Sequence, residues 1–302
     1  MTSESIGFIG LGNMGGRMSK CIVRNGQSVL GFDTNPEMIL SADAHSANSV
    51  AEVVRSCDIV LLSLPDSKVV EAVVLGNEGV LANVRAAQII VDLSTAAPES
   101  TRKISSLLKT KGASYLDAGI SGGAAAADAG TLTLMVGGEE EILAQVQPVL
   151  NNFATNTYYV GASGAGHTTK LLNNFLNAVA LASTAEIMVA AKKADLNLEV
   201  LLEVLNKSSG INFATLNRFP KIIKGDYLKG GLTNTLMMKD VVLYTELASQ
   251  LGIASLNAAG PLASFGLANA LGYANEISNK VVDAIGDVSG GVRLFEGEEK
   301  KT

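Results

Sequence analysis

Three glycines close to the N-terminus, Gly10, Gly12 and Gly15, constrain the fold of this chain more than any other feature. A short apolar run that begins at Ile6 leads into them, and apolar residues at helical spacing follow. A strand, a tight turn and a helix in this order let a backbone approach a pyrophosphate, which the N–H groups at the start of the helix attract. The alternative, a glycine-rich turn without a ligand, is disfavoured by the residues that follow. The predicted dinucleotide-binding loop consists of Gly10, Leu11, Gly12, Asn13, Met14 and Gly15.

The next predicted strand, residues 28–33, ends on the carboxylate of Asp33, close to the offset of about twenty residues that is typical of a dinucleotide-binding unit. This carboxylate can accept hydrogen bonds from both hydroxyls of an adenosine ribose, and its charge would repel a 2′-phosphate. Thr34 and Asn35 follow it, so no arginine comes next to bind such a phosphate. The alternative role for Asp33 is to cap the helix that starts near Asn35. We expect NAD as the cofactor, with NADP possible.

Composition argues against several classes of function. The chain has 302 residues, a net charge of −6 and no run of Lys or Arg, so a nucleic-acid partner is not expected. A strand follows the first few residues directly, and no uninterrupted apolar run has the length of a membrane span. We therefore expect no membrane contact and a cytoplasmic protein. Cys21 and Cys57 are isolated, and His45 and His167 lack ligand spacing, so we expect buried thiols and no metal site.

Strands and helices alternate as far as residue 160, and helical patterns follow from His167 onward. This predicts an α/β N-terminal Rossmann domain and an all-α C-terminal domain, joined by a long interdomain helix. We place the boundary in a glycine-rich stretch, so that residues 1–163 bind the dinucleotide and residues 164–302 serve substrate binding and oligomerisation. The tail from about residue 286 is rich in glycine and charge, and we expect it to fray. The helices predicted after the long one are 198–206, 212–224, 234–251, 257–271 and 275–285.

Several predicted strands are followed by residues suited to ligand binding, at the carboxyl ends where doubly wound sheets bind ligands. Leu64 and Pro65 end a buried strand and would pass under the cofactor, although a simple strand stop is the alternative. Thr95 follows the next strand, where its hydroxyl could contact a ribose or carboxamide, or else cap a helix. Adjacent glycines expose N–H groups that can hold an anion. A substrate carboxylate is therefore predicted on Ser121, Gly122 and Gly123.

Two lysines are candidates for proton transfer or cofactor binding. Lys170 lies near the start of the long helix, and Asn174 follows one turn later on the same face, so an ammonium and an amide could hold one substrate oxygen. A lysine exchanges a proton at neutral pH only where burial or a neighbouring cation lowers its pKa. Lys239 and Asp240 lie together within another predicted helix. The alternative for either lysine is an ordinary solvated side chain.

Six ordered blocks of this sequence resemble the β-hydroxyacid dehydrogenases, a family related to 6-phosphogluconate dehydrogenase. The resemblance covers nearly the whole chain up to about residue 285. Together the blocks are far more specific than any one of them. They are residues 10–15, 64–66, 92–95, 117–123 with 130–133, 164–174 and 238–240.

The resemblance implies a Rossmann domain joined to a helical domain, with the substrate in a cleft between them. It assigns catalysis to Lys170 and Asn174. It also implies that the loop that begins at Ser121 binds the carboxylate of a small substrate. Thr95 and Lys239 match cofactor contacts, and Asp240 matches a residue that braces the substrate site. This chain departs from the family at Ala118-Gly119-Ile120, where relatives carry Ala-Pro-Val. It also carries Ile211 where many relatives have an arginine, which leaves the distal group of the substrate open.

The resemblance and the residues together predict an NAD-dependent oxidoreductase. Hydride would pass between nicotinamide and the β-carbon of a small 3-hydroxy acid or its semialdehyde, with Lys170 as general acid/base. The alternatives are a non-catalytic dinucleotide-binding sensor, an imine reductase, or an enzyme of the 6-phosphogluconate dehydrogenase type on the same scaffold. Lys170 disfavours the imine reductase and the sensor. Apolar, alanine-rich helices after residue 164, and the resemblance, predict a homodimer or homotetramer.

Overall fold

The computed structural model describes residues 5–228 and 230–297. Contacts divide the chain into two compact units that meet between Lys170 and Leu171. The sequence predicts a boundary before residue 164, whereas this division falls inside the long helix α9 (Ala165–Lys193). The first turns of that helix therefore belong to the N-terminal unit. The fold is an α/β Rossmann unit followed by a helical unit, as predicted, and the long helix α9 runs through the junction.

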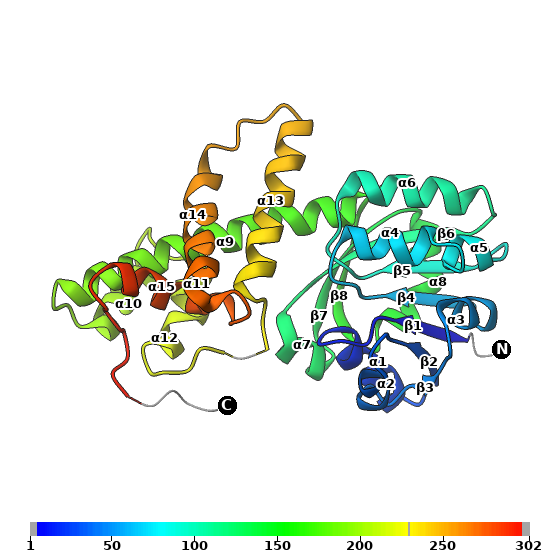
Figure 1. The fold of residues 1–302 in the computed structure, drawn as a ribbon, viewed down its shortest axis with the longest axis horizontal. Helices are drawn as coiled ribbons and strands as arrows, with labels where there is room; N and C mark the ends of the chain where they lie inside the picture. Colours follow the sequence, from blue (N-terminus) through cyan, green and yellow to red (C-terminus); the bar gives the residue numbers. More distant parts are fainter. Residues whose placement is uncertain (1–4, 229, 298–302) are drawn as a thin grey trace. The chain divides into compact units, whose positions relative to one another are not determined.

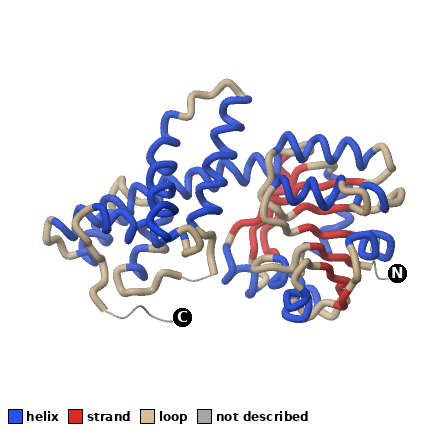
Figure 2. The backbone as a smooth tube through the Cα atoms, viewed as in Figure 1, coloured by secondary structure: helices blue, strands red, loops and turns tan. Residues whose placement is uncertain are grey.

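The described residues of the N-terminal unit form one eight-stranded sheet (Figures 1 and 2). Its strands are β1 (Ile6–Ile9), β2 (Val29–Phe32), β3 (His45–Ser46), β4 (Ile59–Leu62), β5 (Ile89–Asp92), β6 (Ser114–Ser121), β7 (Leu132–Gly137) and β8 (Ala154–Gly161). The order is β3-β2-β1-β4-β5-β6-β7-β8, and only β6 and β7 pair antiparallel. This order places the ends of β1 and β4 beside each other, which is where a doubly wound sheet binds a dinucleotide.

Each central strand is buried on both faces, which explains its unbroken apolar sequence. Ile59 and Leu61 of β4 join one core cluster, whereas Val60 and Leu62 join the other, as the two-residue period of a strand requires. Helices from both sides complete these clusters, so the unit has three layers. The helices are α1 (Gly15–Arg24), α2 (Pro36–Ser41), α3 (Val50–Ser56), α4 (Ser67–Leu75), α5 (Val80–Asn83), α6 (Pro98–Lys109), α7 (Gly123–Ala129) and α8 (Glu140–Leu150).

The starts of several helices follow from local sequence. The Asp66 carboxylate accepts the N–H of Val69 at 2.9 Å and caps α4, and Pro98 occupies the first turn of α6. Among the elements that were not predicted are β3 and α7. The first is a two-residue exposed strand, and the second is a run of alanines that has no amphipathic pattern.

The C-terminal unit is helical, apart from one isolated bridge between Thr233 and Ile277 within the described residues (Figure 2). The predicted helix 212–224 is two helices that break at Arg218, because Pro220 begins a new turn. The predicted helix 275–285 begins later, at Val281. After α9, the helices are α10 (Leu198–Asn206), α11 (Phe213–Asn217), α12 (Phe219–Ile222), α13 (Asn234–Gln250), α14 (Ala259–Ala268) and α15 (Val281–Val288), with short turns at Leu256–Ala258, Asn269–Tyr273 and Ser278–Lys280.

Helix α9 is the centre of this unit. By length and composition it could cross a membrane, with a mean hydropathy of 1.3 over its most apolar window, but 56% of that window is buried inside the protein. Phe175, Ala178, Leu181 and Ala185 recur at helical spacing and belong to the core cluster of the unit. The other helices of the unit contribute most of the remaining members of this cluster, so α9 packs as a core helix.

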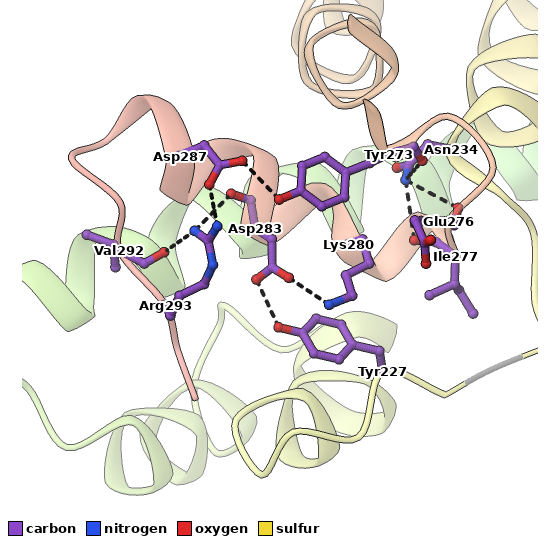
Figure 3. Close-up of polar contacts among 10 residues, drawn as sticks. All are labelled: Tyr227, Asn234, Tyr273, Glu276, Ile277, Lys280, Asp283, Asp287, Val292 and Arg293. Atoms are coloured by element: carbon purple, nitrogen blue, oxygen red, sulfur yellow. Dashed lines mark hydrogen bonds and ion pairs between the residues drawn. The ribbon is translucent and has the colours of Figure 1, made fainter. Parts of the chain in front are cut away.

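Some residues after Gly286 are anchored to the rest of the unit. Leu294 is 6% exposed and belongs to the core cluster, and the Arg293 guanidinium pairs with the Asp287 carboxylate (Figure 3). The hydroxyl of Tyr273 donates to the same carboxylate at 2.9 Å (Figure 3). These contacts hold Asp287, Arg293 and Leu294, whereas Val288 is exposed, and fraying of the tail stays a prediction. Residues 298–302 lie outside the described residues.

Candidate active site

The glycine loop has the geometry that a pyrophosphate needs. Gly10 has a φ of +87°, and a Cβ there would collide with the carbonyl oxygen of Ser63. A Cβ on Gly15 would collide with the carbonyl oxygen of Gly10, so α1 packs directly on the turn. A Cβ on Gly12, by contrast, would have no neighbour within 4 Å. Gly12 therefore faces open space at the N-terminus of α1, where a phosphate can approach the backbone.

The Asp33 carboxylate braces this loop with one oxygen and the start of the next turn with the other. Oδ2 accepts the N–H of Leu11 at 2.7 Å, and Oδ1 accepts the N–H of Asn35 at 2.9 Å. Asn35, and not Asp33, caps α2, since its side chain accepts the N–H of Glu37. Each carboxylate oxygen still has a lone pair for a ribose hydroxyl. The arrangement fits a dinucleotide with an unsubstituted 2′-hydroxyl.

A chain of buried hydrogen bonds fixes the edge of the sheet beyond β4. The Ser94 hydroxyl accepts the N–H of Leu64 at 2.9 Å, and the Asp92 carboxylate accepts the N–H of Ser94 at 3.0 Å. The Tyr115 hydroxyl donates to the other oxygen of Asp92 at 2.7 Å, and burial raises the pKa of Tyr115. This network holds the backbone at Leu64, with Pro65 next in the chain, beside the half-buried Thr95. The cofactor roles of Leu64, Pro65 and Thr95 stay predictions.

The predicted carboxylate loop lies at the end of β6. Gly122 has a φ of +128° and Gly123 a φ of +71°, so both adopt backbone conformations that side chains disfavour. The two glycines are exposed, and Ser121 is half-buried. Backbone N–H groups that turn in this way are accessible to an anion. The loop therefore has the form of the predicted nest, and its ligand stays a prediction.

Side chains on one face of β6 fix the start of α9. Asp117, fully buried, accepts the N–H of Gly164 and the N–H of His167, both at 2.8 Å, and so caps the helix with a carboxylate. Two residues further along β6, a Cβ on Gly119 would lie 2.6 Å from the Cβ of Lys170. The stem of Lys170 thus rests on the backbone of β6, and the residue is 8% exposed. Ser121 follows on the same face of the strand.

The C-terminal unit contains the other predicted polar residues. Asn174 is 2% exposed, and its side-chain amide donates to Oδ2 of Asp240, which is itself 1% exposed. Lys239 forms an ion pair with Oδ1 of Asp240 at 3.2 Å. Asn174, Lys239 and Asp240 therefore form one connected cluster. No group of three or more His, Cys, Asp and Glu side chains suited to a metal occurs among the residues that the structure describes.

Three features of the two units were not identified from the sequence. They are the cap that Asp117 places on α9, the hydrogen bonds that fix the half-buried Arg218, and the link between the hydroxyl of Thr101 and Nδ1 of His167 at 2.7 Å. Asp117 and Arg218 join residues that are far apart in the sequence. The only sequence feature that indicated a special role for Asp117 was the presence of a carboxylate within a predicted buried strand.

Comparison with protein families gives two adjoining matches. Residues 5–161 match the NAD-binding domain of 6-phosphogluconate dehydrogenase. Residues 164–282 match a domain described as NAD-binding of NADP-dependent 3-hydroxyisobutyrate dehydrogenase. Together the two matches cover nearly all of both units.

Curated and solved proteins resemble the chain over most of its length. A 2-(hydroxymethyl)glutarate dehydrogenase of Eubacterium barkeri is 38% identical over 247 residues, which is 81% of this chain and 82% of the relative. A 3-hydroxyisobutyrate dehydrogenase of Pseudomonas aeruginosa is 38% identical over 79% of this chain and 83% of the relative. The structure of Mycobacterium tuberculosis 3-hydroxyisobutyrate dehydrogenase with L-serine has a TM-score of 0.82 at 31% identity, and the match covers 92% of this chain and 98% of that one.

These matches, added to the glycine loop, the bracing carboxylate of Asp33 and the buried lysine, leave one assignment. The chain belongs to the β-hydroxyacid dehydrogenase family and is an oxidoreductase that acts on CH–OH groups with NAD or NADP.

Proposed function

We propose that this chain reversibly oxidises the β-hydroxyl of a small 3-hydroxy acid to the semialdehyde, with NAD as the preferred cofactor and Lys170 as general acid/base. The observation that carries the proposal is the packing of the Lys170 stem on Gly119, two residues before Ser121 on the same strand face. A proton-transfer group and a carboxylate-binding loop are thereby attached to one rigid strand. A 3-hydroxy acid needs such an arrangement, because one carbon separates its carboxylate from its reacting carbon and keeps the distance between them nearly constant.

In the proposed reaction, the Ser121 hydroxyl and the N–H groups of Gly122 and Gly123 hold the substrate carboxylate. Neutral Lys170 accepts the hydroxyl proton as the C–H hydride leaves, and returns the proton in the direction of reduction. The nicotinamide ring supplies the hydride acceptor when NAD is bound. Gly12 and the start of α1 would hold the pyrophosphate, and Asp33 the adenosine ribose.

The remaining predicted residues position these groups. Asn174, oriented by its hydrogen bond to Asp240, would donate to the substrate oxygen where negative charge develops. Lys239, paired with Asp240, would contact the cofactor. Leu64, Pro65 and Thr95 would line the nicotinamide end. An interaction that strengthens as the alkoxide develops raises turnover, and not merely affinity.

The names of the relatives support this substrate class. They are dehydrogenases of 2-(hydroxymethyl)glutarate, 3-hydroxyisobutyrate and L-serine. Each of these compounds has a carboxylate and a hydroxyl on the carbon next to the one that bears it. We propose that the substrate of this chain shares that unit. A dinucleotide-binding sensor, the alternative, would bind NADH without consuming any such compound.

We further propose a cytoplasmic homodimer or homotetramer. Several large apolar side chains of the C-terminal unit are exposed, including Val200 and Val204 one turn apart on α10 and Phe213 on α11. A second copy would cover them. Sedimentation as a monomer at micromolar concentration would rule this assembly out.

The test of Lys170 is its replacement by alanine. Lys170→Ala should lower kcat by about 10²- to 10⁴-fold, the usual contribution of a positioned proton-transfer group. Titration of NADH fluorescence should give an almost unchanged Kd, since Lys170 is not expected to hold the cofactor. Lys103→Ala, which removes an exposed lysine of α6, is the matched control and should keep full turnover. Near-normal kcat in Lys170→Ala would remove Lys170 from catalysis.

A further inference from the structure

Arg218 is held in a fixed position between two short helices of the C-terminal unit. It links α11 to α12, and the residue is half-buried. One Nη donates to Oδ1 of Asn279 at 2.6 Å, and the other donates to Oδ1 of Asn177 at 3.1 Å. The amide of Asn279 is itself fixed, because its nitrogen donates to the carbonyl oxygen of Tyr227 at 2.8 Å. The guanidinium is thus oriented before any ligand arrives.

This half-buried cation has no carboxylate partner in the part of the chain that the structure describes. Within residues 5–228 and 230–297, no carboxylate pairs with Arg218, whereas Arg17, Arg85 and Arg293 each pair with an aspartate. Burial without a compensating anion lowers the pKa of Arg218 to about 10. Each Nη retains a second N–H, and Nε–H completes the set. A bidentate carboxylate needs two such parallel donors.

Arg218 contacts α9 at Asn177, close to the residues of that helix that are proposed to act in the reaction. Lys170, Asn174 and Asn177 occupy positions i, i+4 and i+7 of one continuous helix, so they lie on one face of it. Asn177 is about 4.5 Å beyond Asn174 along the helix axis, at about 1.5 Å per residue. Asn177, which the guanidinium contacts, is therefore about one turn of α9 from the amide proposed to bind the reacting oxygen. The ring of Phe213, 5.7 Å from the Arg218 guanidinium carbon, adds an apolar surface next to it.

We propose that Arg218 and Asn177 bind a second carboxylate of the substrate, which makes the substrate a 3-hydroxy acid with a further carboxylate on its side chain. The proposal rests on the proposed function, because it takes Asn174 as the residue nearest the reacting oxygen. Ile211 stands where many relatives have an arginine, so it offers no charge to the distal group of the substrate. Arg218 would supply that charge instead. Arginine suits this task better than lysine, since its planar fork matches both carboxylate oxygens.

The experiment compares two substrates that differ in one group. 2-(Hydroxymethyl)glutarate carries a distal carboxylate, and 2-(hydroxymethyl)pentanoate has a methyl group in its place. The ratio of their kcat/KM values is measured with NAD for the wild type, Arg218→Gln, Arg218→Lys and Lys221→Gln. Lys221→Gln removes an exposed cation three residues away on α12 and is the matched control for general charge effects. Thermal melting establishes that each variant is folded.

We expect the wild type to prefer the dicarboxylate by about 10- to 100-fold, the factor of a charge-assisted hydrogen bond. The ratio should approach one in Arg218→Gln through a higher KM for the dicarboxylate, recover in part in Arg218→Lys, and stay unchanged in Lys221→Gln. Equal use of both compounds by the wild type would overturn the proposal and leave the proposed function intact. An equal loss on both compounds in Arg218→Gln would make Arg218 structural.

Turnover of neither compound by the wild type would count against the proposed function, and direct binding then decides the role of Arg218. Glutarate and pentanoate are titrated calorimetrically against the wild type and Arg218→Gln. Saturable glutarate binding that Arg218→Gln abolishes supports the carboxylate site. Absence of glutarate binding to the folded wild type overturns it.

Discussion

The substitution Gly119→Ala should displace the proposed acid/base without removing any polar side chain. A Cβ at this position would lie 2.6 Å from the Cβ of Lys170, 3.2 Å from its Cγ and 3.1 Å from the carbonyl oxygen of Gly166. Carbon atoms pack at about 3.5 to 4.0 Å, so the first turns of α9 must move by about 1 Å. A displacement of that size in a reacting group can cost about 10²-fold in rate. Overpacking of this kind also costs about 1–3 kcal/mol of stability.

The assay measures kcat at saturating NAD and 3-hydroxy acid, together with urea unfolding. We expect Gly119→Ala to lose about 10²-fold in kcat while the folded protein still binds NADH. Gly260→Ala on α14 is the matched control, because a Cβ there has no neighbour within 4 Å, and it should leave both quantities near the wild-type values. Wild-type kcat and stability in Gly119→Ala would refute the close packing of Lys170 on β6.

Two further predictions concern the N-terminal unit. Asp33→Ser removes the charge that would repel a 2′-phosphate, so the ratio of kcat/KM for NADP to that for NAD should rise by about tenfold or more; a ratio unchanged in steady-state assays with the two cofactors would contradict the role of Asp33. Burial raises the pKa of the Cys57 thiol to about 11 and also raises that of Cys21, so at pH 8 the native protein should react very slowly with a thiol-specific disulfide reagent, and both thiols should react at once in denaturant. Rapid labelling of the native protein would show that one of these thiols is accessible.

Features that depend on neighbouring residues were predictable from the sequence. The glycine loop, the cap at Asp66 and the proline at the start of α6 each follow from the conformations that a few adjacent residues allow. Strand β3 could not be predicted in this way. It has two exposed residues, and its pairing with β2 comes from the position of the sheet edge. Helix α7 was missed because its alanines give helical propensity without an apolar face.

In the candidate site, too, contacts between nearby residues were predictable and contacts between distant residues were not. Lys170 and Asn174 could be paired from the sequence, because four residues along a helix are always neighbours. The role of Asp117 depends on which face of β6 meets α9, a property of the assembled sheet. Arg218 depends on Asn177 and Asn279, which are about forty and sixty residues away in the sequence. Contacts over such separations depend on tertiary packing, and no local sequence pattern predicts them.

The glycine contacts beneath α9 have a consequence for how this scaffold can diversify. Lys170 is set in place by the main chain of β6 and by the carboxylate of Asp117, while the proposed determinant of the distal group is a single side chain between α11 and α12. Proton transfer and substrate choice would then depend on different residues, so one could change in evolution without the other. An exchange at residue 218 could redirect the enzyme to a new acid, whereas a side chain added at residue 119 of this chain would displace Lys170.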